Sequence, residues 1–101
     1  DILNGGSGDD LLYGGQAKDR LTGGAGADIF AIAAGDGPFD LIKDFVVGED
    51  LIGLRDGLSF GQLNIHRAET NNVMISTNGE FLAKVLNTNV NDFTEAAFTT
   101  V

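Results

Sequence analysis

Aspartates recur every nine residues near the start of the chain. Asp10, Asp19 and Asp28 each follow the first glycine of a Gly-Gly pair by five places, and each precedes a large apolar residue by two. A carboxylate offers oxygen ligands to a hard divalent cation, and the backbone carbonyls around it offer more. The spacing therefore favours metal coordination over other chemistry.

The aspartates belong to three consecutive nonapeptides, residues 5–13, 14–22 and 23–31, and residues 1–4 fit the last four places of a preceding repeat. Repetition of the form G-G-x-G-x-D-x-U-x is typical of calcium-binding parallel β-helices. If six residues of each repeat make a turn and three make a strand, the chain reverses direction every nine residues. Turns two repeats apart then stack on the same edge.

Stacking brings Asp10 over Asp28 on one edge and Asp1 over Asp19 on the other. Parallel strands lie about 4.8 Å apart, and a calcium ion with ligands at about 2.4 Å on opposite sides spans the same distance. Because two carboxylates are too few for this ion, backbone carbonyls must supply the rest, and glycine tolerates the φ angles that aim them inward. We expect binding and folding to be one event, since stacked aspartates repel one another without an ion.

Other motifs with glycine or acidic residues do not fit. A flexible linker has no reason to repeat Asp and an apolar residue in phase. The stretch 24–26 lacks the rest of a phosphate-binding loop, and no EF-hand loop occurs. Asp40 and Asp44 could be the paired carboxylates of a glycoside hydrolase, but a polar strand face or a peripheral calcium site explains them better.

The composition fits a single acidic domain. The chain has 101 residues, 15 acidic against 6 basic, and a formal net charge of −9. Nucleic acid is not expected as a partner, because it requires a basic face. The first residue is not Met and lies in the middle of a repeat, so we expect a piece of a longer protein. No apolar run in this sequence is long enough to cross a membrane, and no signal peptide is present in it.

From residue 33 on, the repeat period is lost and short strands are predicted. Glycine and proline make 33–38 a loop. Strands are expected at 41–47, 51–54, 62–67, 73–77 and 81–86, with turns at 70–72 and at Asn78-Gly79. Asn91-Asp92 with Glu95 would cap a short helix through Ala97. The predicted fold is all-β: a short parallel β-roll at 1–31, capped by an antiparallel β segment at 32–101 with a short C-terminal helical turn, as one continuous unit.

The repeats resemble those of the RTX (repeat-in-toxin), or hemolysin-type calcium-binding, family. The second half is similar to the segment that follows the repeats in many members, at residues 40–45, 48–54 and 81–85. The resemblance implies Ca²⁺ as cofactor, an extracellular location and folding on meeting calcium outside the cell. It also implies export through a type I secretion apparatus, for which residues 98–101 look like the C-terminal signal. Any activity would reside elsewhere in the longer protein, and the chain itself is not expected to be an enzyme.

The resemblance also implies a ligand set. In the family, one turn offers the carbonyls of its second and fourth residues and its Asp, and the stacked turn offers its first and third residues and its Asp. Carried over, the best site is Gly6, Gly8 and Asp10 with Gly23, Ala25 and Asp28. On the opposite edge Gly14, Gln16 and Asp19 would face Asp1, and Gly15, Ala17 and Asp19 would form a half-site with Asp36 or Asp40 as its partner.

Two other hypotheses remain open. An adhesin or surface-layer module would grip a partner through a ladder of exposed Thr or aromatic residues, but the exposed strand positions hold Leu11, Arg20 and Ile29. An enzyme is suggested by the G-x-S-x-G match at 57–61, the pattern of a hydrolase nucleophile elbow. That motif requires a strand-turn-helix in an α/β sheet, which the hairpin signals here do not favour. We expect neither Ser59 nor His66 to be catalytic.

Overall fold

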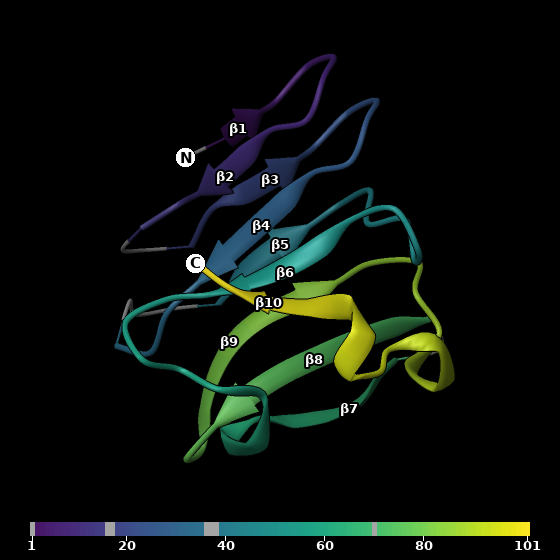
Figure 1. Cartoon of the computed structure of the whole chain (residues 1–101). Coiled ribbons are helices and arrows are strands. Elements are labelled where there is room, and N and C mark those ends of the chain that lie inside the picture. The colour runs from purple at the N-terminus through teal and green to yellow at the C-terminus, as the bar shows by residue number, and fades with distance from the viewer. Residues whose placement is uncertain (1, 16–17, 36–38, 70) are drawn as a thin grey trace.

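The computed structural model describes residues 2–15, 18–35, 39–69 and 71–101, which form two β-sheets with the core between them (Figure 1). The six-stranded sheet has the order β1-β3-β5-β9-β8-β7, and the four-stranded sheet has the order β10-β6-β4-β2. The strands are β1 Ile2–Asn4, β2 Leu11–Tyr13, β3 Arg20–Thr22, β4 Ile29–Ile32, β5 Asp40–Ile42, β6 Leu51–Leu54, β7 Asn64–Ala68, β8 Asn72–Thr77, β9 Glu80–Val85 and β10 Phe98–Thr100.

The repeats alternate between the two sheets, as their period predicts. β1 pairs in parallel with β3 in one sheet, and β2 pairs in parallel with β4 in the other. The large apolar residue of each repeat is buried, with Leu12 6%, Leu21 0% and Phe30 0% exposed. β2 and β3 thus contribute one large side chain each to the core, and β4 contributes two, Phe30 and Ile32, while the turns between strands project from the two edges.

Both sheets continue past the end of the repeats. β5 pairs in parallel with β3, and β6 pairs in parallel with β4. Ile42 and Ile52 are fully buried opposite Leu21 and Phe30, so they extend the same two rows of core side chains. The sheets and the core therefore cross the predicted division between residues 31 and 32.

The lower end of the six-stranded sheet is antiparallel. β7 pairs with β8 and β8 pairs with β9, and the β8–β9 connection is the predicted Asn78-Gly79 hairpin. Both turn residues have positive φ angles, 49° and 79°, as a type I′ turn requires. β9 then pairs in parallel with β5, which attaches this cap to the last coil of the roll.

The C-terminal segment differs from the sequence expectation. Its helical turns are two short 3-10 helices, Val90–Asp92 and Glu95–Ala97, with Asn89 and Thr94 at the N-cap positions rather than Asn91-Asp92. The Asn89 side chain accepts the N–H of Asn91, whereas the Thr94 side chain makes no cap bond. Residues 98–100 form strand β10, parallel to β6. No helix in the described part of the chain is long and apolar enough to span a membrane.

The strand expected at 41–47 is also shorter than predicted. β5 ends at Ile42, and the following residues form a loop with a turn at 47–49. Beyond β5, the N–H of Val46 donates to Asp50 Oδ2 instead of to a strand, and the Asp44 carboxylate accepts the N–H groups of Gly23 and Gly24 in the turn after β3.

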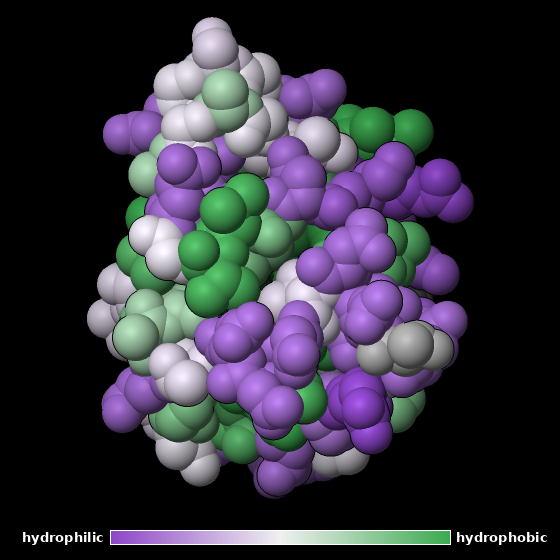
Figure 2. Space-filling view, turned by 90° about the vertical axis from the view of Figure 1, so that its right-hand side faces the viewer, coloured by the Kyte–Doolittle hydropathy of each residue, from purple (hydrophilic) through white to green (hydrophobic). Residues whose placement is uncertain are grey.

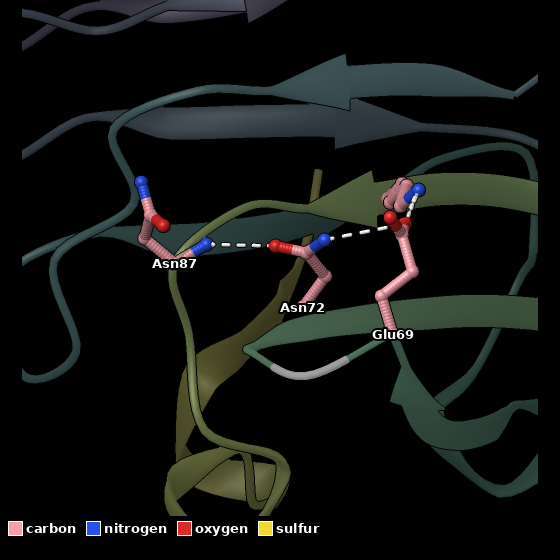
Figure 3. Close-up of polar contacts among 4 residues, drawn as sticks. Glu69, Asn72 and Asn87 are labelled. Carbon is pink, nitrogen blue, oxygen red and sulfur yellow. Dashed lines mark hydrogen bonds and ion pairs between the residues drawn. The ribbon is translucent and has the colours of Figure 1, made fainter.

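A polar network ties the β7–β8 connection to the chain that follows β9 (Figure 3). The backbone N–H of Asn87 donates to Asn72 Oδ1 at 3.0 Å, and Asn72 Nδ2 donates to Glu69 Oε1 at 3.3 Å. Glu69 also forms an ion pair with Lys84 of β9. The Asn72–Asn87 bond fixes the antiparallel cap to the segment leading into the C-terminal turns, and the other two contacts link Glu69 to β8 and β9.

Candidate metal centre

Two glycine-rich turns stack on one edge of the molecule, at the right of Figure 1: the upper turn, residues 5–10, and the lower turn, residues 23–28. Figure 2 faces this edge and shows pale, glycine-rich surface at the top and many polar residues below it. The carbonyl of Asp10 accepts the N–H of Ile29 at 2.8 Å, and the N–H of Asp10 donates to Asp28 Oδ1 at 2.9 Å. The turns are therefore in the register that the nine-residue period predicts.

Carbonyl oxygens of the upper turn point at the lower turn. A Cβ on Gly24 would collide with the carbonyl oxygen of Gly6, and a Cβ on Gly26 would collide with that of Gly8. Both lower glycines have positive φ angles, 83° and 99°. Glycine is thus required at these two positions for the backbone conformation and for the close approach of the carbonyls.

A carbonyl of the lower turn also points at the upper turn. The position of a Cβ on Gly5 lies 2.8 Å from the carbonyl oxygen of Gly23 and 2.6 Å from Asp10 Oδ2, so these two oxygens face the same space. Asp28 reaches up to the upper turn through its Oδ1 atom, and Ala25 lies exposed in the lower turn. The structure thus brings the residues of the best predicted site into two facing turns.

Asp10 and Asp28 each keep one carboxylate oxygen that no atom of the described residues satisfies. Among the described residues, Asp10 Oδ2 and Asp28 Oδ2 are buried without a hydrogen-bond partner, and Asp28 as a whole is 1% exposed. A buried carboxylate oxygen without a partner costs several kcal/mol. The described residues contain no cluster of three His, Cys, Asp or Glu side chains suited to a metal. The arrangement therefore fits a cation that takes its ligands from carboxylates and backbone carbonyls together, as calcium does.

The opposite edge repeats part of this arrangement. Asp19 and Asp40 are buried, 1% and 6% exposed, and the N–H of Asp19 donates to Asp40 Oδ1 at 3.0 Å. Asp19 Oδ2 lies against Gly14, where a Cβ would collide with it. The structure thus brings Asp40, one of the two predicted substitutes for a lost repeat, next to the predicted half-site.

The other residues expected on this edge are mostly outside the described part of the chain. Gly15 is described and has a positive φ angle of 75°. The remaining predicted ligands lie outside the described residues: Asp1, Gln16, Ala17 and Asp36.

Two aspartates outside the predicted site, Asp50 and Asp44, continue the series of hydrogen bonds between backbone amides and aspartates down the first edge, which we call the aspartate ladder. The N–H of Asp28 donates to Asp50 Oδ1 at 2.8 Å, and the N–H of Val46 donates to Asp50 Oδ2 at 2.9 Å. Asp44 accepts the N–H groups of Gly23 and Gly24, both at 2.8 Å, with one oxygen each. The loop after β5 therefore closes the lower turn with carboxylates.

The period could not reveal Asp50, because it stands 22 residues after Asp28 rather than 18. A usable signal exists in the local pattern. Asp50 precedes the buried Ile52 by two places, as Asp28 precedes the buried Phe30.

The G-x-S-x-G match does not form a nucleophile elbow. Ser59 is exposed and precedes the 3-10 helix Phe60–Gln62, and its N–H donates to Gln62 Oε1 at 2.9 Å. The next element is the antiparallel strand β7, on which His66 is exposed. The strand-turn-helix geometry that the motif requires is absent from this region.

Comparison with known families agrees with the geometry of the turns. Residues 1–30 match the family model of the RTX calcium-binding nonapeptide repeat in four copies. No curated protein matches the chain. The first 30 residues are thus RTX calcium-binding nonapeptide repeats, and the ion that such repeats bind is Ca²⁺.

Proposed function

We propose that the chain is a module whose folding is driven by calcium and which stabilises one end of a larger extracellular protein. The observation that carries the proposal is the pair of buried carboxylate oxygens on Asp10 and Asp28 in stacked turns. A cation between the turns would give both oxygens a partner and offset the repulsion between the two aspartates. The turns are rich in glycine, which loses much conformational entropy when it is ordered, and the binding free energy of the ion would offset that loss.

The first site uses the six residues predicted from the repeat pattern: Gly6, Gly8, Asp10, Gly23, Ala25 and Asp28. Support comes from the carbonyls of Gly6, Gly8 and Gly23, which face the space between the turns. A second ion on the opposite edge would use Asp19 and Gly14 with Asp1 and Gln16. A third position, at Gly15, Ala17 and Asp19, would be completed by Asp40 or Asp36.

We further propose that residues 1–31 and 32–101 fold as one unit, because parallel pairing and the core run through both.

Export before folding would follow from the low calcium concentration of the cytosol. In the folded chain, residues 98–100 form β10, and the N–H of Val101 donates to the carbonyl of Leu54 at 3.0 Å. A secretion apparatus that reads this segment would therefore have to read it before calcium-driven folding pairs it with β6.

The test of the first site is a double-mutant cycle on Asp10→Asn and Asp28→Asn, followed by calcium titration with circular dichroism and calorimetry. If both carboxylates bind one ion, the second substitution should cost less than it does alone, because residues of one site are coupled. Asp92→Asn is the matched control, since Asp92 is exposed in a C-terminal 3-10 turn and the charge change is the same. Strictly additive losses, or an equal loss in the control, would contradict a shared ion.

A further inference from the structure

The outward face of the six-stranded sheet concentrates basic residues in an acidic molecule. One row of paired positions crosses all six strands and alternates apolar with basic or histidine side chains. Its members, in order, are Ile2, Arg20, Leu41, Lys84, Met74 and His66. The strand neighbours Leu21, Ile42 and Val85 are fully buried, and since successive side chains of a strand point to opposite faces, the row lies on the outward face of the sheet, where Met74 alone of its apolar members is covered, at 8% exposed.

Two more lysines lie on this face. Lys18 stands two places before Arg20, and its Nζ atom lies 5.0 Å from the centroid of the Phe39 ring. Lys43 stands two places after Leu41 and is exposed, and its N–H donates to the carbonyl of Leu21 at 3.0 Å, which continues the sheet. Four of the chain's six Lys and Arg residues therefore share one face.

Apolar side chains accompany the charges. Ile2 is 77% exposed, and Phe81, which packs edge-on against Phe39, is 48% exposed. Arg20 and Lys84 flank Leu41 at a separation of two strand spacings, roughly 10 Å. The ion pair on this face joins Lys84 to Glu69, while the aspartate ladders lie at the edges of the sheets. The outward face thus carries cationic side chains with exposed apolar side chains between and beside them.

We propose that this face docks on an anionic lipid surface. Lipid phosphates complement the basic residues, and the boundary with the acyl chains complements the apolar residues between them, which is the combination that surface-bound proteins use. A linear polyanion would match the charges but not the exposed Ile2 and Phe81. Calcium strengthens the attraction, because each bound ion adds two positive charges at the acidic edges and reduces the repulsion of the membrane by a chain of net charge −9.

The experiment measures co-sedimentation of the full chain with vesicles of phosphatidylglycerol and phosphatidylcholine, and with pure phosphatidylcholine vesicles, at a fixed saturating calcium concentration. Arg20→Gln and Lys43→Gln should each weaken binding to the anionic vesicles about 5-fold, the effect of one basic residue near such a surface. Arg67→Gln removes the same charge from β7 at a position opposite the buried Val73, off the row, and should change binding less than about 2-fold. Arg20→Lys should restore most of the binding.

Circular dichroism in calcium ensures that each variant compared is folded, so the result is independent of whether calcium drives folding. Equal losses in Arg20→Gln and Arg67→Gln would overturn the proposal, because calcium bridging or net charge would then explain the binding. It would also be overturned by equal binding to pure phosphatidylcholine, or by binding to an anionic polysaccharide such as alginate without binding to the vesicles.

Discussion

Asp28 and Asp50 occupy successive steps of one ladder, yet their carboxylates are satisfied in different ways. Both are buried, 1% and 2% exposed, and each accepts the N–H of the aspartate one step above it through Oδ1. The second oxygen of Asp50 accepts the N–H of Val46, whereas the second oxygen of Asp28 has no hydrogen-bond partner among the described residues. The same buried charge is thus held by amides at the lower end, whereas in the repeats one oxygen is left for the proposed cation.

The difference arises from the backbone around each aspartate. The loop after β5 is longer than a repeat turn and folds back so that the N–H of Val46 reaches the Asp50 carboxylate. A repeat turn directs carbonyls at its neighbour, as Gly6 and Gly8 show, and no amide of the described residues reaches the second oxygen of Asp28. Calcium dependence should therefore be concentrated in the N-terminal repeats. The core is shared, but its C-terminal end also includes the rings of Phe45, Phe93 and Phe98, which pack against one another outside the repeats.

Removing calcium gives the largest expected effect. In excess chelator, amides of β2 and β4 should lose hydrogen-exchange protection, because the turns that join these strands to the roll would have unpaired carboxylates. Amides of β8 and β9, in the antiparallel cap, should keep part of theirs. Exchange measured by NMR with and without calcium checks this, and magnesium should restore little, since it demands a tighter octahedral site. Full protection of β2 in chelator would contradict the distinction between the two ends.

The comparison of Asp28 with Asp50 predicts different effects for two substitutions that remove the same charge. Asp28→Asn should reduce the slope of unfolding free energy against the logarithm of calcium concentration, because fewer ions are taken up on folding. Asp50→Asn should leave that slope unchanged but lower the unfolding free energy by about 2 kcal/mol, since an amide nitrogen would face the N–H of Val46. Urea unfolding at several calcium concentrations measures both quantities. A reduced slope in Asp50→Asn would mean that Asp50 also binds the ion.

The sequence alone predicts the repeats well, because a fixed nine-residue period determines which strands pair and which residues are buried. It also predicts the Asn78-Gly79 turn, whose φ angles only a few residue types adopt readily. It does not predict β10 or the role of Asp44, since a strand that pairs across 46 residues and a side chain that binds a turn 20 residues away leave no local pattern. The ligands on the glycine-rich edge remain predictions that the geometry supports.

Glycines in the two stacked turns offer a finer test. Gly6 and Gly24 have similar positive φ angles, 79° and 83°, but a Cβ on Gly6 meets nothing within 4 Å, whereas one on Gly24 collides with the Gly6 carbonyl. Gly6→Ala should therefore lose about 1–2 kcal/mol for the left-handed backbone alone. Gly24→Ala should lose about 1 kcal/mol or more beyond that, because the carbonyl must move. Urea unfolding at saturating calcium compares them, and equal losses would show that the turns are not closely stacked.

Ser59→Ala should have the smallest effect. Ser59 is exposed and forms a capping box with Gln62 at the start of the 3-10 helix, in which its backbone N–H, which alanine also has, donates to Gln62 Oε1. Only the hydroxyl's part of this cap would be lost, so the unfolding free energy at saturating calcium should fall by less than about 1 kcal/mol. Hydrolytic activity of a larger protein that carries the chain should also be unchanged. A fall of about 100-fold at unchanged stability would instead identify a nucleophile, and it would require a base that the exposed His66, on an antiparallel strand, is not positioned to provide.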